Sequence, residues 1–171
     1  MTLRHVPLAL ALLVLSACAT HPKPLQGGFA DITPHAAAAT DSTGAMVRWG
    51  GRIVQVEPRE DRTCFEMIST RLTSTGRPYW ADDDTNGRFI ACRAGFYDPA
   101  VFEKNREVTF TGRIEGYETR RIGEYDYRFP RIAADVVYLW PRREDEYRYH
   151  HHHHYHRPFP PPPWPWWGWW W

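Results

Sequence analysis

Residues 106–118, "REVTFTGRIEGYE", alternate between apolar and polar side chains, and this constrains the fold more than any other stretch. Val108, Phe110 and Ile114 fall on one face of an extended chain, while the threonines and charged residues between them fall on the other. A period of two residues indicates a β-strand with one buried face. The segment therefore predicts a sheet that covers an apolar core.

Four other stretches have the composition of strands and follow at regular spacing. They cover residues 46–58, 63–72, 87–96 and 134–141. Gly50 and Gly51 lie inside the first stretch, where paired glycines indicate a bulge or a sharp bend at a barrel corner. Residues 98–105, "DPAVFEKN", predict one short helical turn with Asp98 as its N-cap. The expected fold is a mainly β, OB-like five-stranded barrel, with a small two-sheet sandwich as the alternative.

Residues 120–130, "RRIGEYDYRFP", combine aromatic and charged side chains. The favoured interpretation is a hairpin with Gly123 in its turn and with Tyr125, Tyr127 and Phe129 on one half-buried face. The alternative is an exposed ridge that binds sugars or peptides.

The first 17 residues have the layout of a secretory signal. One basic residue precedes an apolar run at residues 8–15, and small residues follow it. The run is shorter than the roughly 20 residues that a spanning helix needs. It ends in Leu-Ser-Ala-Cys at residues 15–18, which resembles the lipobox of bacterial lipoproteins and so implies lipidation of Cys18. In Gram-negative relatives, Ala19 after the cysteine implies transfer to the outer membrane. An ordinary cleaved signal is the alternative.

The remaining chain divides by composition. Residues 18–44 are rich in Ala, Thr, Pro and Gly and predict a flexible tether. Within it, the isolated apolar residues Phe29 and Ile32 indicate that "FADITP" docks on the domain. Residues 45–141 form the predicted β domain, and residues 142–171 form a His-, Pro- and Trp-rich tail.

Five blocks in one order resemble the Slp family of Gram-negative outer-membrane lipoproteins, the starvation-inducible lipoproteins. The blocks are "WGGRIVQVEP", "GRFIACRAGFYDPAVF", "REVTFTGRIEG", "IGEYDYRFPRI" and "VVYLW". The resemblance implies a lipid-anchored β domain on the periplasmic face of the outer membrane, with envelope stabilisation under stress as its expected role. It implies no catalytic residues and no cofactor beyond the lipid on Cys18.

Cys64 and Cys92 remain once Cys18 is lipidated. In an oxidising periplasm such a pair predicts a disulfide. Two buried free thiols are the alternative. Neither cysteine has a His or Cys neighbour at metal-ligand spacing.

The tail contains two kinds of candidate contact residue. A histidine tract predicts weak, unselective binding of Zn²⁺, Ni²⁺ or Cu²⁺; its members are His150, His151, His152, His153, His154 and His156. Six tryptophans predict a contact with the membrane interface or with a ligand; they are Trp164, Trp166, Trp167, Trp169, Trp170 and Trp171. A disordered low-complexity tail is the alternative.

The net charge and the absence of catalytic motifs narrow the range of functions that the sequence predicts. The chain has 21 Lys and Arg against 20 Asp and Glu, and this balance argues against a nucleic-acid binder. No nucleophile triad or phosphate loop is present, so the sequence predicts a structural or adaptor lipoprotein and no enzyme. The expected partners are outer-membrane lipid and an envelope protein, lipopolysaccharide or peptidoglycan. The main alternative is a periplasmic binding module for an envelope glycan or a metal ion, acting through the barrel face or the tail. A third, weaker alternative is an envelope hydrolase with an unrecognised site.

Overall fold

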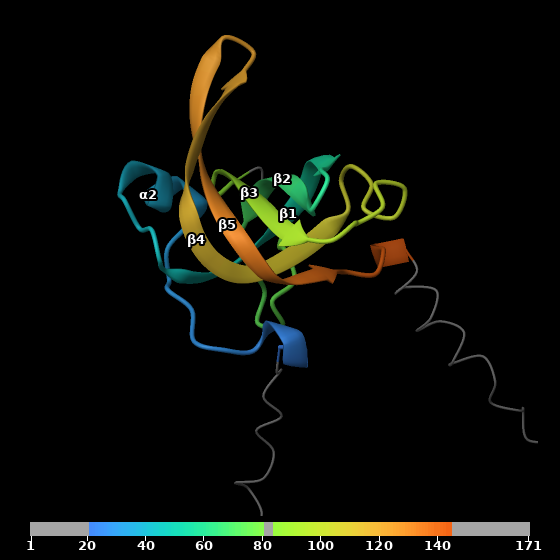
Figure 1. Cartoon of the computed structure of the whole chain (residues 1–171). Helices are drawn as coiled ribbons and strands as arrows, with labels where there is room; N and C mark the ends of the chain where they lie inside the picture. Colours follow the sequence, from blue (N-terminus) through green and yellow to red (C-terminus); the bar gives the residue numbers. More distant parts are fainter. Residues whose placement is uncertain (1–20, 81–83, 145–171) are drawn as a thin grey trace, which may run out of the picture. The chain divides into compact units, whose positions relative to one another are not determined.

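Five strands close into a barrel in the computed structural model, which describes residues 21–80 and 84–144 (Figure 1). Their order around the barrel is β1-β2-β3-β5-β4. They are β1 (Met46–Pro58), β2 (Arg62–Thr70), β3 (Arg88–Ala94), β4 (Glu107–Ile122) and β5 (Tyr125–Leu139). All neighbours pair antiparallel except β3 and β5, which pair parallel. The predicted OB-like, mainly β fold is therefore confirmed, and the sandwich alternative is not adopted.

Strand β1 makes the corner that its paired glycines predict. Its first half pairs with β4, from Met46 to Arg52, and its second half pairs with β2, from Gly50 to Pro58. Gly51 pairs on both sides, and a Cβ atom there would lie 1.9 Å from the backbone oxygen of Ile68. Glycine is therefore required because the neighbouring backbone occupies the space of any side chain.

Aromatic rings form a column through the barrel core. Trp49 contacts Phe89 at 5.3 Å between ring centroids, Phe89 contacts Phe110 at 6.0 Å, and Phe110 contacts Phe65 at 5.3 Å. All four side chains are buried. Aliphatic residues at alternate strand positions fill the space around them, as the period-two pattern predicts.

The short helix lies in a different place from the predicted one. Residues 98–105 form turns and no helix, although the Asp98 carboxylate accepts a hydrogen bond from the Ala100 amide at 2.9 Å. This segment bends back so that Phe102 reaches Phe65, with ring centroids 5.4 Å apart. The described α-helix is instead α2 (Pro34–Ala39), capped by the Thr33 hydroxyl, which accepts from the Ala36 amide.

Residues 21–44, called the N-terminal strap below, differ from the expected flexible tether. The strap contains the 3₁₀ helix η1 (Lys23–Leu25) and α2, and Leu25 and Ala37 are fully buried. The Ala30 amide donates to the Met46 carbonyl oxygen at 2.7 Å. Few apolar residues suffice here because backbone groups of the strap bond directly to the barrel. The predicted docking of residues 29–34 is confirmed.

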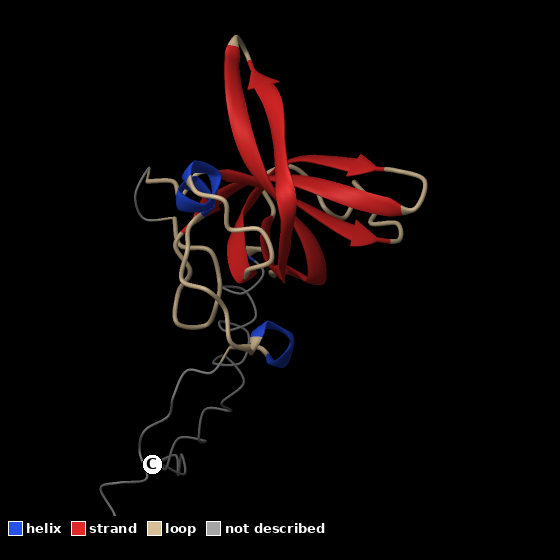
Figure 2. Cartoon of the chain, turned by 60° about the vertical axis from the view of Figure 1, so that its left-hand side comes forward, coloured by secondary structure: helices blue, strands red, loops and turns tan. Residues whose placement is uncertain are grey.

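Residues 116–131, called the arm below, extend β4 and β5 beyond the barrel as a twisted hairpin (Figures 1 and 2). Gly123 takes a φ of 63° at the first of its two turn residues, where type II′ turns carry glycine. Phe129 is fully buried, Tyr127 is half-buried, and Tyr125 remains 69% exposed. The predicted hairpin is therefore correct, and its apolar face is buried at the root and open at the tip.

Candidate functional site

The predicted lipidation site and the predicted tail contacts lie outside the described residues. Cys18 belongs to residues 1–20, and the His150–156 and Trp164–171 candidates belong to residues 145–171. They remain predictions. The described residues hold the disulfide, a network of ion pairs and a groove.

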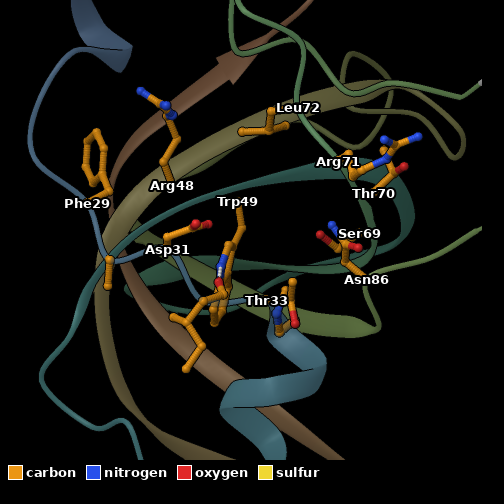
Figure 3. A pocket seen from close by; sticks show the side chains of 13 residues that line it. Phe29, Asp31, Thr33, Arg48, Trp49, Ser69, Thr70, Arg71, Leu72 and Asn86 are labelled. Atoms are coloured by element: carbon orange, nitrogen blue, oxygen red, sulfur yellow. Dashed lines mark hydrogen bonds between the residues drawn. The ribbon is translucent and has the colours of Figure 1, made fainter.

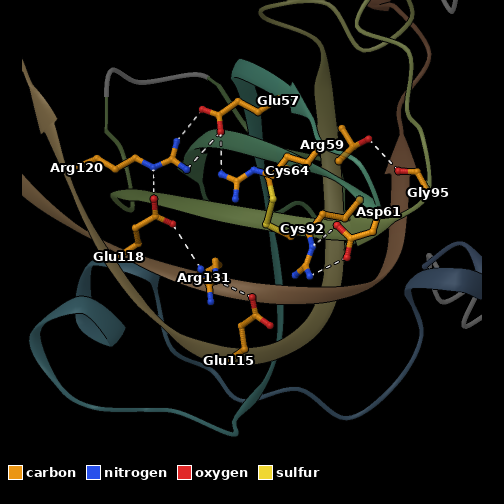
Figure 4. The surroundings of a disulfide bond; sticks show 12 residues. Glu57, Arg59, Asp61, Cys64, Cys92, Gly95, Glu115, Glu118, Arg120 and Arg131 are labelled. Atoms are coloured by element: carbon orange, nitrogen blue, oxygen red, sulfur yellow. Dashed lines mark hydrogen bonds and ion pairs between the residues drawn. A yellow bond between two sulfur atoms is a disulfide. The ribbon is translucent and has the colours of Figure 1, made fainter.

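Cys64 and Cys92 form the predicted disulfide (Figure 4). They lie directly opposite each other on β2 and β3, with 4.1 Å between their Cα atoms. Both are buried, and they pack with Ile90 and with Phe129 from the root of the arm. The bond therefore joins two strands beneath the place where the arm leaves the barrel, and it has the position of a structural cross-link.

A ladder of ion pairs crosses the barrel wall next to the disulfide (Figure 4). Arg120 of the arm bonds to Glu57 of β1 at 2.9 Å and to Glu118 at 2.7 Å. Arg131 of β5 continues the ladder to Glu115 at 2.6 Å. The network connects the arm to a strand with which the arm does not pair.

Two competing effects determine the pKa of Glu57. Partial burial alone would raise this pKa, but hydrogen bonds from Arg59 and Arg120 outweigh the burial and hold it below its ordinary value. For Arg120, burial opposes the charged form, but its bonds to Glu118 and Glu57 raise its pKa. Both groups are therefore ionised at neutral pH, and the ladder stabilises the arm in one orientation.

A groove with a volume of about 590 Å³ lies between the strap and the edge of the barrel (Figure 3). Strap residues 29–34 form one wall, and residues 69–72 with Asn86 form the other. Trp49 stands between them, and its Nε1–H donates to the Ile32 carbonyl oxygen at 2.7 Å. That bond holds the strap at the distance from the barrel that leaves the groove open.

Polar groups in the groove are available to a ligand. Within the described part of the chain, the Asp31 carboxylate and the Asn86 side-chain amide form no hydrogen bond or ion pair. Arg48 donates from Nη1 to the Leu25 carbonyl oxygen at 3.0 Å and forms no ion pair with any described residue. Its pKa is lowered by burial, because no carboxylate compensates its partly desolvated charge. Free donors and acceptors around an aromatic centre are typical of sites for small polar ligands.

No pattern in the sequence predicts the groove or the ladder. The groove residues range from Phe29 to Asn86, a separation of 57 positions, and their register follows from barrel closure, which no local pattern encodes. The isolated apolar residues Phe29 and Ile32 were the available signal, because they indicated that the strap docks.

Two arrangements that are common in catalytic sites are absent from the described residues. Residues 21–80 and 84–144 contain no group of three His, Cys, Asp or Glu side chains placed to hold a metal ion. In the same ranges no serine, threonine or tyrosine hydroxyl hydrogen-bonds to a histidine. The helices described in these ranges fall short of the length and hydropathy that a membrane-spanning helix needs.

Comparison with known proteins identifies the family. The family model described as the outer membrane lipoprotein Slp family matches residues 15–171. An uncharacterized protein of Haemophilus influenzae (strain ATCC 51907 / DSM 11121 / KW20 / Rd) is 29% identical over 132 residues, covering 74% of this chain and 70% of that protein. The uncharacterized lipoprotein YeaY of Escherichia coli (strain K12) is 30% identical over 132 residues, covering 75% of this chain and 67% of that protein.

A small single-stranded DNA-binding protein from Streptomyces coelicolor is loosely similar in structure, with a TM-score of 0.36 and 14% identity over 56% of this chain and 94% of that chain. The family model spans most of the chain, and this chain belongs to the Slp family of outer membrane lipoproteins.

Proposed function

We propose that this protein is held by lipid on Cys18 in the periplasmic leaflet of the outer membrane, where it has a structural or adaptor role in envelope stress. The observation that carries the proposal is the family match, which begins at Leu15 and so includes the whole of Leu-Ser-Ala-Cys. A single acyl chain anchors only marginally, whereas two or more hold a protein stably on a bilayer.

The barrel supports a role without catalysis. Its wall is joined by the Cys64–Cys92 disulfide and by the ion-pair ladder, and its ends are covered by the strap and by residues 97–102. Such cross-links stabilise a small domain in an oxidising compartment. These cross-links favour a stable, rigid domain, and such a domain suits a structural lipoprotein.

Cell fractionation tests the anchor. Wild-type protein is expected in the outer membrane, with a lipid mass on the peptide that begins at Cys18, while Cys18→Ser loses both the lipid and the membrane fraction. The matched variant Ala19→Asp separates anchoring from sorting, because it is expected to stay lipidated but to collect in the inner membrane. Wild-type protein recovered without lipid from the soluble periplasm would refute the proposal.

The groove favours a second candidate function, the binding of an envelope glycan. The unpartnered Asp31 carboxylate and Asn86 amide beside an aromatic residue are suited to sugar hydroxyls. Saturation-transfer NMR with peptidoglycan and lipopolysaccharide fragments tests this function, with Asp31→Asn expected to weaken any signal. Equal transfer in the wild type and in Asp31→Asn would remove the groove as the site.

A further inference from the structure

The position of His21 limits how far the barrel can lie from the anchor. The His21 carbonyl oxygen accepts a hydrogen bond from the Gln26 side chain at 2.8 Å, and Leu25 is fully buried. The chain is therefore fixed to the barrel from about residue 21. Covalent geometry allows at most about 11 Å between the Cα atoms of Cys18 and His21. If Cys18 carries lipid, as the proposed function holds, the surface around His21 must lie within that reach of the bilayer.

That surface has a defined composition. The His21 ring and Leu25 lie against Gly76, and the Gly76 carbonyl oxygen accepts a hydrogen bond from the Thr109 hydroxyl at 2.8 Å. We call this surface the anchor face; it consists of residues 21–29, the turn at residues 73–77, and Arg48. It is continuous with the end of the groove at Arg48 and Phe29 (Figure 3).

The anchor face has a cationic character. Residues 21–29 and 73–77 contain His21, Lys23 and Arg77 and no Asp or Glu. Arg77 is compensated by Glu107 at 2.7 Å, but Lys23 is exposed and Arg48 forms no ion pair with a described residue. Near an anionic bilayer each such cation raises the affinity about fivefold. Anchoring places these cations at the headgroups, where their attraction acts at high effective concentration.

The arm lies at the opposite end of the same unit. Thr109, which contacts the anchor face, is near the start of the 16-residue strand β4, and Ile122 at the tip of the arm is its last residue. Both views show η1 and the arm tip at opposite ends of the barrel (Figures 1 and 2). A membrane in contact with one end therefore leaves the other end directed away from it.

We propose that the anchor face rests on the phospholipid headgroups of the leaflet that holds Cys18, so that the arm projects away from the bilayer. The bilayer is the occupant that the short span to Cys18 and the cations at Lys23 and Arg48 both favour. The tip of the arm, with the exposed Tyr125, is then the part of the barrel domain that is farthest from the anchor.

Depth measurements on the full lipidated protein test this orientation. The protein is placed in vesicles of phosphatidylethanolamine and phosphatidylglycerol that contain a lipid spin-labelled at its headgroup. A fluorophore is attached to Ser74→Cys on the anchor face or to Glu124→Cys at the arm tip, with Cys64 and Cys92 kept oxidised. Both positions are exposed, and neither side chain forms a hydrogen bond or an ion pair with a described residue. Quenching at position 74 is expected to be about threefold or more greater than at position 124, because quenching falls steeply over the length of the arm.

A pair of charge variants provides the control. Lys23→Gln is expected to lower the quenching at position 74, while Arg121→Gln at the arm tip removes the same charge and is expected to leave it unchanged. Equal quenching at both positions, or an equal effect of the two variants, overturns the orientation. Because quenching is read only from vesicle-bound protein, that failure is distinct from failure of the anchor, in which the protein carries no lipid and stays out of the membrane.

Discussion

The N-terminal strap and the arm both lie outside the closed wall of the barrel, yet they are held in different ways. The strap has few apolar residues and is fixed by single backbone hydrogen bonds and by the buried side chains of Leu25 and Ala37. The arm is a continuous part of two barrel strands, and its root is buried against the disulfide. A segment of low apolar content can therefore take a defined position when its backbone groups find partners on the barrel.

The two regions also contact each other. The Tyr117 hydroxyl on the arm donates to the Thr40 carbonyl oxygen at 3.1 Å and accepts from the Ser42 amide at 2.7 Å. Near β3, the Tyr127 hydroxyl accepts from the Arg88 amide, while the His35 amide donates to the Asn86 carbonyl oxygen. The root of the arm thus contacts the strap. Mutations in each region can test how far the stability of one depends on the other.

The largest effect is expected from truncating the buried residue of each region. Phe129→Ala should lower the free energy of unfolding by about 3–5 kcal/mol, since it leaves a cavity between the arm and the disulfide. Leu25→Ala should lower the free energy of unfolding by about 2–5 kcal/mol while the strap stays docked. The loss is smaller if the strap detaches, because no cavity then remains. Urea unfolding measures both. Native-state hydrogen exchange should show that Leu25→Ala exposes strap amides while the amides of the arm root stay protected. Equal loss of protection in both regions would mean that they unfold as one unit.

Removal of the disulfide should lower the free energy of unfolding by about 3–4 kcal/mol in the chain-entropy model, because the cysteines are separated by 28 residues. The double variant Cys64→Ala/Cys92→Ala is compared with the oxidised wild type by thermal unfolding. The arm root should lose more hydrogen-exchange protection than the strap, because Phe129 packs on the bond. Greater loss in the strap would contradict the structural role assigned to this cross-link.

Gly87 lies where both regions meet β3, and its substitution should affect them together. It has a φ of +91°, and a Cβ atom there would lie 2.9 Å from the Tyr127 hydroxyl oxygen and 3.1 Å from the His35 amide nitrogen. Gly87→Ala is therefore expected to cost about 1–3 kcal/mol from backbone strain and crowding. Gly95→Ala is the matched control, since it has a φ of +92° but open space around it. An equal effect at Gly95 would show that backbone strain alone, without the crowding at the junction, determines the cost.

The barrel could be predicted from the sequence because its strands carry the signal locally. The alternation at Val108, Phe110 and Ile114 fixes one buried face, and Gly123 places the turn of the arm. The strap could not be predicted in the same way. Its stability comes from partners such as Met46 and Trp49, which become neighbours only after the barrel closes.

The site was predictable to a smaller extent. Cys64 and Cys92 were expected to pair because two cysteines in an exported chain have few alternatives, and the fold then places them opposite each other. The ladder was not expected, because Glu57 and Arg120 are separated by 63 positions and meet only through the curvature of β4. Charged residues at such separation give no sequence pattern that distinguishes a partner from a solvated side chain.

The smallest expected effect is the contribution of the ion-pair ladder to the pH dependence of stability. The ladder holds the arm and does not include the strap, so this contribution should differ between the two regions. The pKa of Glu57 lies below its ordinary value of 4.5, because the bonds from Arg59 and Arg120 outweigh burial. A carboxyl group with a lowered pKa in the folded state stabilises the fold fully above its ordinary pKa and loses this contribution as the pH falls through the folded value. The free energy of unfolding should therefore fall as the pH drops below about 5, with less than about 1 kcal/mol due to the ladder, because its side chains are partly solvated. Arg120→Gln should flatten this part of the profile, while Arg121→Gln, on the same hairpin but without a partner among the described residues, should not.

Urea titrations at each pH provide the curves, and hydrogen exchange localises the change. The part of the loss that Arg120→Gln removes should appear in the arm. The strap carboxyl Asp41, whose pKa is lowered mainly by the Thr43 hydroxyl and amide, should respond to pH in the same way in both proteins. Parallel profiles for Arg120→Gln and the wild type would mean that the ladder orients the arm without stabilising it.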